Sequence, residues 1–348
     1  MHTIPDAPRR HAWGRRSEVV VITGASAGVG RATARAFARR GARIGLVARD
    51  ADALAETVRE VEALGGEAVM CVADVARASD VEAAATMFEE RLGPIDVWVN
   101  NAMVTVVSPV ASLAPDEVCR VTEVNYLGTV YGTLAALRRM RLRNRGAIVQ
   151  VGSALAYRAI PLQAPYCATK FAIRGFTDAL RSELIHDRSR VHVTMVHMPA
   201  LNTPQFDWCR TRMPREPQPV PPVFQPEVAA RAIVWAARHR RRELFVGAPT
   251  VKAVWANKLV PGLLDRYLAR FGYASQEAPT PVAASRADNL FAPVHGAYAA
   301  HGRFDAVAHA RSVELWLDTH RGLVLGVAAL VGALAWRAGW WRSAPPAA

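Results

Sequence analysis

The sequence of 348 residues has little cysteine and no cysteine or histidine spacing typical of a metal site. Its four cysteines, Cys71, Cys119, Cys167 and Cys209, show no disulfide pattern, which suits a reducing compartment. We expect Cys167 to be a small buried side chain rather than a reactive thiol. The first residues lack the apolar run of a signal peptide. We therefore expect the folded part of the chain to stay in the cytoplasm.

Metal ligands and nucleic-acid-binding motifs are also missing. His295, His301 and His309 lie in one region, but no acidic or cysteine partner is spaced to complete a metal site with them. We expect these histidines to lie at the surface or to be hydrogen-bonded, and we predict no metal. No internal repeat accompanies them, and no nucleic-acid motif accompanies the net charge of +13. The sequence therefore predicts neither a metalloprotein nor a nucleic-acid-binding protein.

Short apolar runs alternate with helical patterns along most of the chain. The expected strands are Val19–Ile22, Arg43–Ala48, Ala68–Val72, Val97–Asn101, Ala147–Val151, Val191–His197 and Leu244–Val246. Such alternation is typical of a parallel sheet with helices on both faces. The sequence therefore predicts an α/β, doubly wound fold of the Rossmann type, followed by a C-terminal helical and loop extension that ends in a hydrophobic segment.

A glycine-rich turn follows the first expected strand. The run from Thr23 includes Gly24, Ser26, Gly28, Val29 and Gly30, and it opens a helical stretch rich in alanine and arginine. Strand, glycine turn and helix form the context that a dinucleotide-binding loop requires. The glycines allow the backbone to approach a pyrophosphate, which rests on the helix N-terminus.

A second motif indicates proton transfer. Tyr166 and Lys170 are separated by four residues, so a helix places them on one face. An ammonium group beside a phenol favours the phenolate and lowers its pKa toward the range of a general acid/base. Ser153, thirteen residues before Tyr166, offers a hydroxyl that could hold a substrate oxygen.

The glycine spacing, combined with Ser153, Tyr166 and Lys170, resembles the short-chain dehydrogenase/reductase family. Further matches occur in order along residues 17–203, with weaker similarity to about residue 250. The resemblance implies adenine contacts from Asp74 and Val75 and cofactor contacts from Asn101, Ala102, Tyr166, Lys170, Pro199 and Thr203, with Lys170 holding the nicotinamide ribose. It also implies a fourth catalytic residue, Asn125, that helps to hold a proton-relay water. Met103 and Ala200 stand where the family usually has glycine, which puts a side chain near the expected cofactor.

The position after the second strand bears on the choice of cofactor. The acid that would bind a ribose 2′-hydroxyl is missing there, and Arg49 follows the strand. A guanidinium at this place can pair with a 2′-phosphate, so we predict NADP in preference to NAD. The alternative is an arginine solvated at a strand end.

The predicted organisation has four parts. Residues 1–16 form a basic tail, 17–250 the NAD(P)-binding catalytic domain, 251–320 an extension, and 321–342 a membrane-anchoring segment. Seven prolines in residues 204–226 disfavour a regular helix or strand, and we expect a loop that covers the substrate or, alternatively, a passive surface loop. Residues 251–272 predict helices broken at Pro261, which could pack in the core or face a membrane interface.

The segment 322–336 has no charged residue, and two tryptophans follow it. It is shorter than the roughly 20 residues that usually cross a bilayer. We expect a membrane anchor that spans the bilayer or lies within one leaflet, and a buried helix is the alternative.

Arginines gather in residues 1–16, 138–145 and 238–242, each directly before an expected strand. Parallel strands begin at one edge of a sheet, so we expect these arginines opposite the active site, where they are solvated or dock on an anionic membrane.

These observations predict an NADP-dependent oxidoreductase, associated with a membrane, that interconverts a carbonyl and a secondary alcohol. Its expected partner is a small, lipophilic carbonyl or alcohol substrate, and homo-oligomerisation stays open. The alternative is a non-catalytic NADP(H) sensor or scaffold at the membrane.

Overall fold

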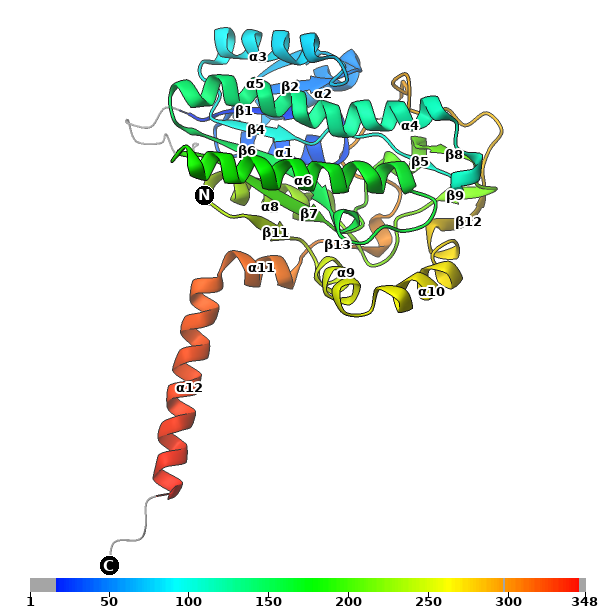
Figure 1. The fold of residues 1–348 in the computed structure, drawn as a ribbon. Coiled ribbons are helices and arrows are strands. Elements are labelled where there is room, and N and C mark those ends of the chain that lie inside the picture. Colours follow the sequence, from blue (N-terminus) through cyan, green and yellow to red (C-terminus); the bar gives the residue numbers. More distant parts are fainter. Residues whose placement is uncertain (1–16, 297, 344–348) are drawn as a thin grey trace, which may run out of the picture.

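The computed structural model describes residues 17–296 and 298–343, and its centre is a seven-stranded sheet (Figure 1). The strands lie in the order β3, β2, β1, β4, β6, β7, β11, and every neighbouring pair is parallel. Their bounds are β1 Val19–Thr23, β2 Arg43–Ala48, β3 Glu67–Val72, β4 Val97–Asn100, β6 Gly146–Ser153, β7 Val191–Met198 and β11 Glu243–Phe245. The order reverses between β1 and β4, and ligands of such sheets bind at the carboxyl ends of the strands around this point.

All seven strands expected from the sequence are present, with ends that differ by two residues at most. Helices cover both faces of the sheet. One face carries α1 (Gly28–Ala38), α2 (Ala51–Ala63) and α8 (Pro226–Arg238), and the other carries α3 (Ala78–Leu92), α4 (Pro115–Thr122), α5 (Gly128–Leu142) and α6 (Ala164–His186). The doubly wound α/β fold is therefore confirmed.

The strand β1 shows why this sheet needs two helical layers. All five of its residues are buried. Val20 and Ile22 belong to the core under α1, α2 and α8, whereas Val19 and Val21 belong to the core on the opposite face. Because neighbouring side chains of a strand point to opposite faces, a strand that is apolar at every position must be covered on both sides.

The proline-rich loop is more regular than expected. It contains α7 (Gln205–Trp208), β8 (Arg210–Thr211), β9 (Arg215–Pro217) and β10 (Val223–Phe224). These strands pair in turn with β5 (Val106–Val107), β12 (Glu277–Pro281) and β13 (Ala308–His309). Each pair is a separate two-stranded sheet, so every strand in it is an edge strand. Proline is tolerated in an edge strand because the backbone on its outer side has no hydrogen-bond partner. The expectation of no strand in this loop was therefore wrong.

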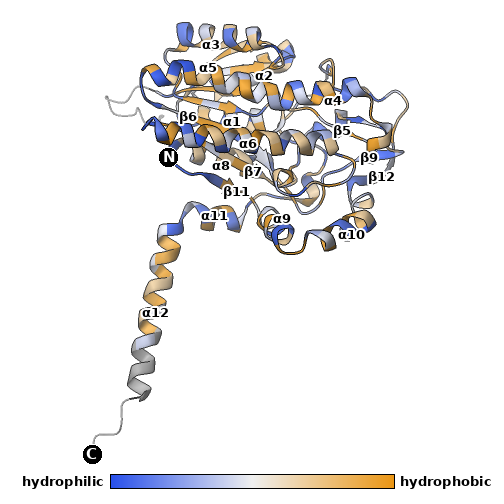
Figure 2. Cartoon of the chain, viewed as in Figure 1, coloured by the Kyte–Doolittle hydropathy of each residue, from blue (hydrophilic) through white to orange (hydrophobic). Residues whose placement is uncertain are grey.

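In the part of the chain that the structure describes, four α-helices follow the sheet: α9 (Ala248–Leu259), α10 (Pro261–Phe271), α11 (Val313–Thr319) and α12 (Arg321–Ser343). The break between α9 and α10 falls at Pro261, as the sequence predicts. The helix α12 projects away from the rest of the chain, and its first turns are apolar (Figure 2). Over residues 17–296 and 298–343, no single helix is both long and apolar enough to cross a bilayer, but α11 and Arg321–Leu334, bent by 86°, pass that test as a pair.

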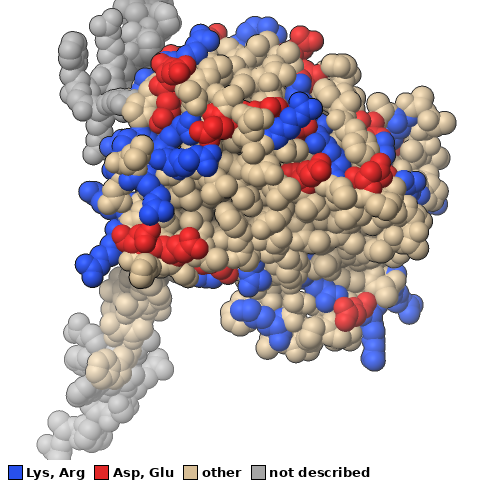
Figure 3. All heavy atoms as spheres, turned by 45° about the horizontal axis from the view of Figure 1, so that its top comes forward, with Lys and Arg blue, Asp and Glu red and all other residues tan. Residues whose placement is uncertain are grey.

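The arginines of residues 138–145 and 238–242 precede β6 and β11, at the edge opposite the carboxyl ends of the strands. Basic side chains gather at one end of the molecule (Figure 3). Most of them pair with acids: Arg138 and Arg139 with Glu82, Arg141 with Asp187, Arg143 with Glu89, Arg145 with Asp96, Arg238 with Glu18 and Arg242 with Asp178. Because carboxylates of the protein itself neutralise most of these arginines, the pairs favour the solvated surface over the membrane-docking surface. Residues 1–16 lie outside the described residues.

Two helical glycines give opposite predictions for the same substitution. A Cβ atom at Gly132 of α5 would lie 2.2 Å from Asn100 Oδ1, whereas a Cβ atom at Gly175 of α6 would meet nothing within 4 Å. We expect Gly132→Ala to lower the free energy of unfolding by about 1–3 kcal/mol through overpacking. Gly175→Ala should raise it by about 0.5–1 kcal/mol, because alanine loses less backbone entropy in a helix. Chemical denaturation of the two variants checks both signs, and a Gly132→Ala protein as stable as the parent would contradict the packing described here.

Candidate active site

A cavity of about 430 Å³ lies at the carboxyl ends of the central strands. It is lined by residues from the glycine turn, the ends of β2, β3, β4, β6 and β7, the proline-rich loop, and the extension. The sequence-predicted residues that line it are Gly24, Ser26, Gly28, Val29, Arg49, Asp74, Val75, Asn101, Ala102, Ser153, Tyr166, Lys170, Pro199 and Thr203. Segments far apart in the sequence therefore meet at one place, where a nucleotide and a substrate could both bind.

The glycine turn has no room for a side chain at Gly24 or Gly30. Gly24 and Gly28 have positive φ angles of 66° and 52°. A Cβ atom at Gly24 would lie 2.8 Å from the Cα atom of Ala102, and one at Gly30 would lie 2.1 Å from the carbonyl oxygen of Gly24. The turn is therefore a backbone cradle at the start of α1, whose N-terminal N–H groups suit a phosphate.

Polar groups between β1 and β4 fix this cradle. Asn101 Nδ2 donates to the carbonyl oxygens of Thr23 and Gly24, at 2.9 and 3.2 Å. The Thr23 hydroxyl accepts from the backbone N–H groups of Asn101 and Ala102, at 3.0 and 3.1 Å. Asn101 and Ala102 therefore hold the glycine turn in place, in addition to lining the cavity.

Asp74, expected at the adenine end, has a partner that the sequence did not suggest. Its carboxylate accepts from Arg120 of α4 at 2.6 Å and from the N–H group of Ala76 at 3.0 Å. Burial alone would raise the pKa of Asp74, but these two hydrogen bonds outweigh it and lower the pKa. Asp74 is thus an ionised side chain at the wall of the cavity.

Ser153 ends β6, and Tyr166 and Lys170 lie in the first turns of α6. The ammonium group of Lys170 is 5.4 Å from the centroid of the Tyr166 ring and donates to the carbonyl oxygen of Val151 at 2.7 Å. Both Ser153 and Lys170 are buried. The helix and the strand end therefore bring the three groups together as their spacing predicts.

Burial controls the protonation of this group. It raises the pKa of Tyr166, and a hydrogen bond with Ser153 only partly offsets that rise. Burial also lowers the pKa of Lys170 to about 8. The expected lowering of the phenol's pKa by Lys170 is not met in this structure, because desolvation is the largest effect on Tyr166.

Asn125 lies in a π-helical turn, Glu123–Leu127, between α4 and α5. Its Oδ1 atom accepts from the N–H group of Val104 at 2.8 Å, and its Nδ2 atom donates to the Val104 carbonyl oxygen at 3.0 Å and to Thr169 at 3.3 Å. Single π turns inside helices are frequent at functional sites. Through the Asn125 side chain, the turn connects Val104, in the segment after β4, to Thr169 of α6, which is adjacent to Lys170.

Arg49 lines the cavity, but the extension holds its guanidinium. The group donates to the backbone carbonyl oxygens of Asn289, Leu290 and Phe291. Burial and the neighbouring charge of Arg120 lower the pKa of Arg49. No carboxylate pairs with Arg49 among the described residues, so this cation remains available to an anion.

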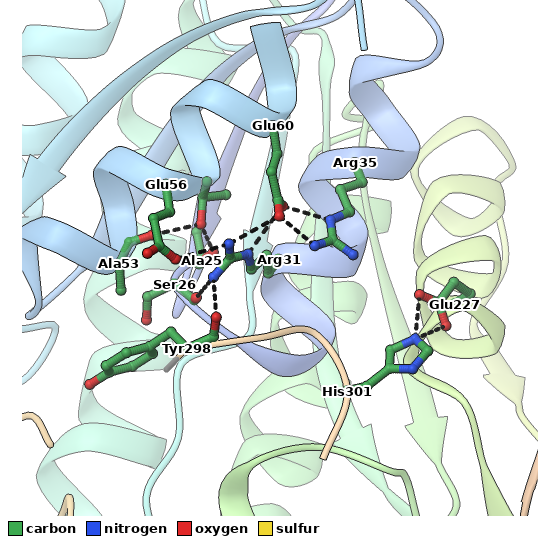
Figure 4. Close-up of polar contacts among 11 residues, drawn as sticks. Ala25, Ser26, Arg31, Arg35, Ala53, Glu56, Glu60, Glu227, Tyr298 and His301 are labelled. Carbon is green, nitrogen blue, oxygen red and sulfur yellow. Dashed lines mark hydrogen bonds and ion pairs between the residues drawn. The ribbon is translucent and has the colours of Figure 1, made fainter. Parts of the chain in front are cut away.

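Residues 298–302 of the extension also lie against the glycine turn. The carbonyl oxygen of Ala299 accepts from the N–H group of Gly28 at 3.0 Å, and the carbonyl oxygen of Tyr298 accepts from Arg31 of α1 at 2.7 Å (Figure 4). Arg31 also pairs with Glu60 of α2, whose pKa is about 2 because its hydrogen bonds with Arg35 and Arg31 outweigh the effect of burial. Sequence reasoning missed this contribution, since only folding brings residue 299 to residue 28.

A second missed group lies behind Ser153. The ring of His197 on β7 is fully buried, with Nδ1 3.2 Å from the Ser153 carbonyl oxygen and Nε2 3.1 Å from Glu243 Oε1. Glu243 also accepts a hydrogen bond from the Tyr157 hydroxyl. Two features of the sequence could have indicated this group. A histidine, His197, ends an expected strand two residues before Pro199, and an acid, Glu243, directly precedes the expected strand Leu244–Val246.

The two departures from the glycine pattern, Met103 and Ala200, both line the cavity. Pro199 and Thr203 line the same side, and a Cβ atom at Gly28 would lie 3.2 Å from the Thr203 side chain. Met103 and Ala200 therefore place side chains at this cavity, as expected from the sequence.

Comparisons with known proteins agree with this geometry. The family described as short chain dehydrogenase matches residues 18–212. An uncharacterized oxidoreductase of Bacillus subtilis (strain 168), YxnA, is 31% identical over 325 residues, which cover 93% of this chain and 90% of that protein. A 3-dehydrosphinganine reductase of Danio rerio is 34% identical over 223 residues, or 62% of this chain and 67% of that protein.

A solved structure is also similar. The alcohol dehydrogenase of the archaeon Thermococcus sibiricus, complexed with 5-hydroxy-NADP, is 28% identical with a TM-score of 0.58. The match covers 66% of this chain and 96% of that one. The part of the present chain that has no counterpart there is therefore about a third of its length.

The His197 and Glu243 pair predicts a pH-dependent contribution to stability. Burial would raise the pKa of Glu243, but hydrogen bonds from His197 and Tyr157 lower it to about 2. A carboxyl group with a lowered pKa stabilises the fold above its unfolded pKa of about 4.3, and this stabilisation is lost as the pH falls toward 2. We expect Glu243→Gln to lower the free energy of unfolding by about 2–3 kcal/mol at pH 7. The difference from the parent should shrink below pH 4 in denaturant titrations, and a difference that is constant from pH 7 to pH 3 would contradict it.

Proposed function

The chain belongs to the short-chain dehydrogenase family, and from this premise we propose that it is an NADP-dependent oxidoreductase that interconverts a carbonyl and a secondary alcohol on a lipophilic substrate. That it is an oxidoreductase follows from the family and from its relatives. The choice of NADP, the interconversion of a carbonyl and an alcohol, and the lipophilic class of substrate are the parts that we propose. The observation that carries them is the placement of Ser153, Tyr166 and Lys170 around one cavity that the glycine turn also lines.

Each catalytic side chain has a separate role in this proposal. The Tyr166 hydroxyl donates its proton to the substrate oxygen during reduction and accepts it during oxidation. The Ser153 hydroxyl orients that oxygen, and a buried ammonium at Lys170 favours the phenolate form when the proton leaves. Asn125 supports the water through which the proton is replaced. The cofactor, when bound, supplies the hydride that adds to the carbonyl carbon.

The residues present fit a dinucleotide. Gly24 and Gly30 form a cradle that a Cβ atom would fill, and the N-terminal turn of α1 adds N–H groups at Val29 and Gly30 for the pyrophosphate. The N–H group of Gly28 is bonded to Ala299, so the phosphates would rely on its neighbours. Asp74, Val75 and Ala102 would face the adenosine half, and Pro199 and Thr203 the nicotinamide half.

The preference for NADP depends on Arg49. It is a cation without a carboxylate partner among the described residues, and it lines the cavity at the end of β2, where a ribose 2′-phosphate would lie. The similar alcohol dehydrogenase was solved with an NADP derivative, which supports the same choice.

A lipophilic substrate is supported by the cavity and by one relative. Apolar side chains, among them Val107, Leu155, Ile160, Phe206 and Val220, line the part of the cavity near the proline-rich loop. The relative from Danio rerio is a 3-dehydrosphinganine reductase. We therefore favour a ketone or aldehyde that partitions into lipid.

Membrane association through α12 is part of the proposal. The described side chains at the start of α12 are exposed and apolar, including Leu323, Leu325, Leu330 and Leu334. Burial of such side chains in a bilayer removes them from water. The catalytic part would lie in the cytoplasm beside that membrane.

The competing function is a non-catalytic NADP(H) sensor or scaffold. It would use the glycine turn and Arg49, but it has no need for Tyr166 and Lys170 beside Ser153. The presence of all three in one cavity favours catalysis.

The central prediction concerns Tyr166→Phe, which removes the proton donor and keeps the ring. We expect turnover of a lipophilic ketone with NADPH to fall by at least about 100-fold, the usual scale for loss of a general acid, while cofactor binding survives. Loss of NADPH absorbance in a single turnover measures the first effect, and titration of NADPH measures the second. The variant Tyr131→Phe, on α5 and outside the cavity, is the matched control. If the Tyr166→Phe protein reduces the ketone as fast as the parent, the assigned catalytic role of Tyr166 is wrong and the sensor function is favoured.

The cofactor prediction concerns Arg49→Asp. We expect the parent to bind NADPH more tightly than NADH, and the variant to reverse that order, because it loses a charge-assisted contact with the 2′-phosphate and gains an acceptor for a ribose 2′-hydroxyl. Arg39→Asp, on the exposed end of α1, controls for the change of charge. Equal affinities of the parent for the two nucleotides would disprove the role of Arg49.

A further inference from the structure

The helices α9 and α10 are joined by the single residue Val260, and both expose large apolar side chains; the pair is called the hairpin below. Trp255, Leu259, Leu263, Tyr267 and Phe271 recur at every fourth position, and each exposes between 49% and 74% of its surface. No residue of α10 is buried. A helix on the surface of a water-soluble protein usually has the reverse arrangement, with its apolar side against the core.

The inner side of this hairpin is held by polar contacts. Arg158 donates to Asn257 of α9 at 3.1 Å and to Asp265 of α10 at 2.6 Å. Asn257 in turn donates to the carbonyl oxygen of Tyr157 at 2.9 Å. The hairpin is therefore attached by hydrogen bonds and an ion pair to the chain between Ser153 and Tyr166, while its large apolar side chains point away from the protein.

The charges of the hairpin are mostly cationic. Lys252, Lys258, Arg266 and Arg270 are all exposed. Asp265, the one acid of the two helices, is the residue that pairs with Arg158. Two of the cations lie over exposed aromatic rings, Lys258 over Trp255 at 5.3 Å and Arg270 over Phe271 at 5.6 Å. Aromatic and aliphatic side chains flanked by cations are typical of a helix that lies in the headgroup region of an anionic bilayer.

Two spatial relations give this surface a function. The hairpin lies on the side of the molecule from which α12 projects (Figure 1). In addition, Pro249, Thr250 and Ala253 of α9 line the same cavity as Ser153 and Tyr166. One side of α9 therefore faces the proposed reaction centre, and the outer side of the hairpin is free for a bilayer.

We propose that the α9–α10 hairpin docks flat on an anionic bilayer beside α12 and admits a lipid-dissolved substrate to the cavity along α9. The docking stands on the exposed side chains and charges alone. The entry of substrate rests on the function proposed above, so the two parts need separate measurements.

Docking is tested on the full chain with its exposed and partly exposed cysteines replaced (Cys119→Ser, Cys71→Ser) and one cysteine introduced by Leu263→Cys. A fluorophore on that cysteine should be quenched by nitroxide-labelled lipids in phosphatidylglycerol vesicles, at a depth of about 5–10 Å. The same fluorophore placed through Leu134→Cys, on α5 at the far side of the molecule, should not be quenched. Equal quenching at the two positions, or none at position 263, would overturn the docking surface whether or not the protein is an enzyme.

Substrate entry is tested by the full-chain double variant Leu263→Glu/Tyr267→Glu, neither residue of which lines the cavity. With a long-chain ketone dissolved in the vesicles, we expect kcat/KM to fall by roughly tenfold, because the variant loses buried apolar surface at the interface. With a short, water-soluble ketone, kcat/KM should stay unchanged. The control Leu134→Glu/Ile185→Glu changes two exposed apolar residues elsewhere and should affect neither substrate. Equal losses for the two ketones would overturn entry along α9, whereas a parent that reduces neither ketone would refute the proposed function and leave the quenching result to decide docking.

Discussion

The close contact between the turn after β1 and the turn after β4 is the constraint on which the rest of the site depends. The Gly24 backbone packs so tightly on Ala102 that a Cβ atom would lie 2.8 Å from the Ala102 Cα atom. Asn101 and Thr23 then tie the two turns together through four hydrogen bonds. Because these strands are adjacent at the point where the strand order reverses, their ends form the floor of the cavity. A side chain at Gly24 or Gly30 would disturb the cradle and the position of Asn101 together.

Burial is the second influence on the site. It lowers the pKa of Lys170 to about 8 and raises the pKa of Tyr166, so the two groups titrate further apart than they would in water. Desolvation therefore favours the neutral form of both groups and keeps the Tyr166 hydroxyl protonated. The buried His197 and Glu243 pair supports the strand end that carries Ser153. Ser153, Tyr166 and Lys170 are thus positioned by the core of the protein as well as by their spacing in the sequence.

The extension after β11 does more than follow the catalytic fold. Its residues 289–291 hold Arg49, its residue Ala299 accepts from Gly28, and its short strands pair with the proline-rich loop. Its hairpin α9–α10 is fixed to the chain between Ser153 and Tyr166. The glycine turn, the proline-rich loop and the hairpin are therefore connected through one segment, which gives the outer surface of the protein a direct structural link to the cavity.

Much of the site could be predicted without coordinates. The parallel α/β fold follows from buried apolar runs that alternate with helical patterns, since strands apolar at every position must be covered on both faces. The glycine turn and the four-residue spacing of Tyr166 and Lys170 are local patterns, so the chain alone specifies them. Their assignment to the short-chain dehydrogenase family is confirmed.

Only the tertiary structure decided which distant groups meet. The contacts of Ala299 with Gly28, of Arg120 with Asp74 and of His197 with Glu243 join residues between 46 and 271 positions apart, and no local pattern encodes such pairs. The strands of the proline-rich loop escaped prediction for the same reason, because each forms only when a partner from elsewhere in the chain lies beside it. The sequence by itself determined the strands, the glycine turn and the spacing of Ser153, Tyr166 and Lys170, because the causes of these features are local. The protonation of Tyr166, the partners of Arg49 and the outward direction of the apolar side of the hairpin depend on burial and on long-range contacts, which exist only in the folded chain.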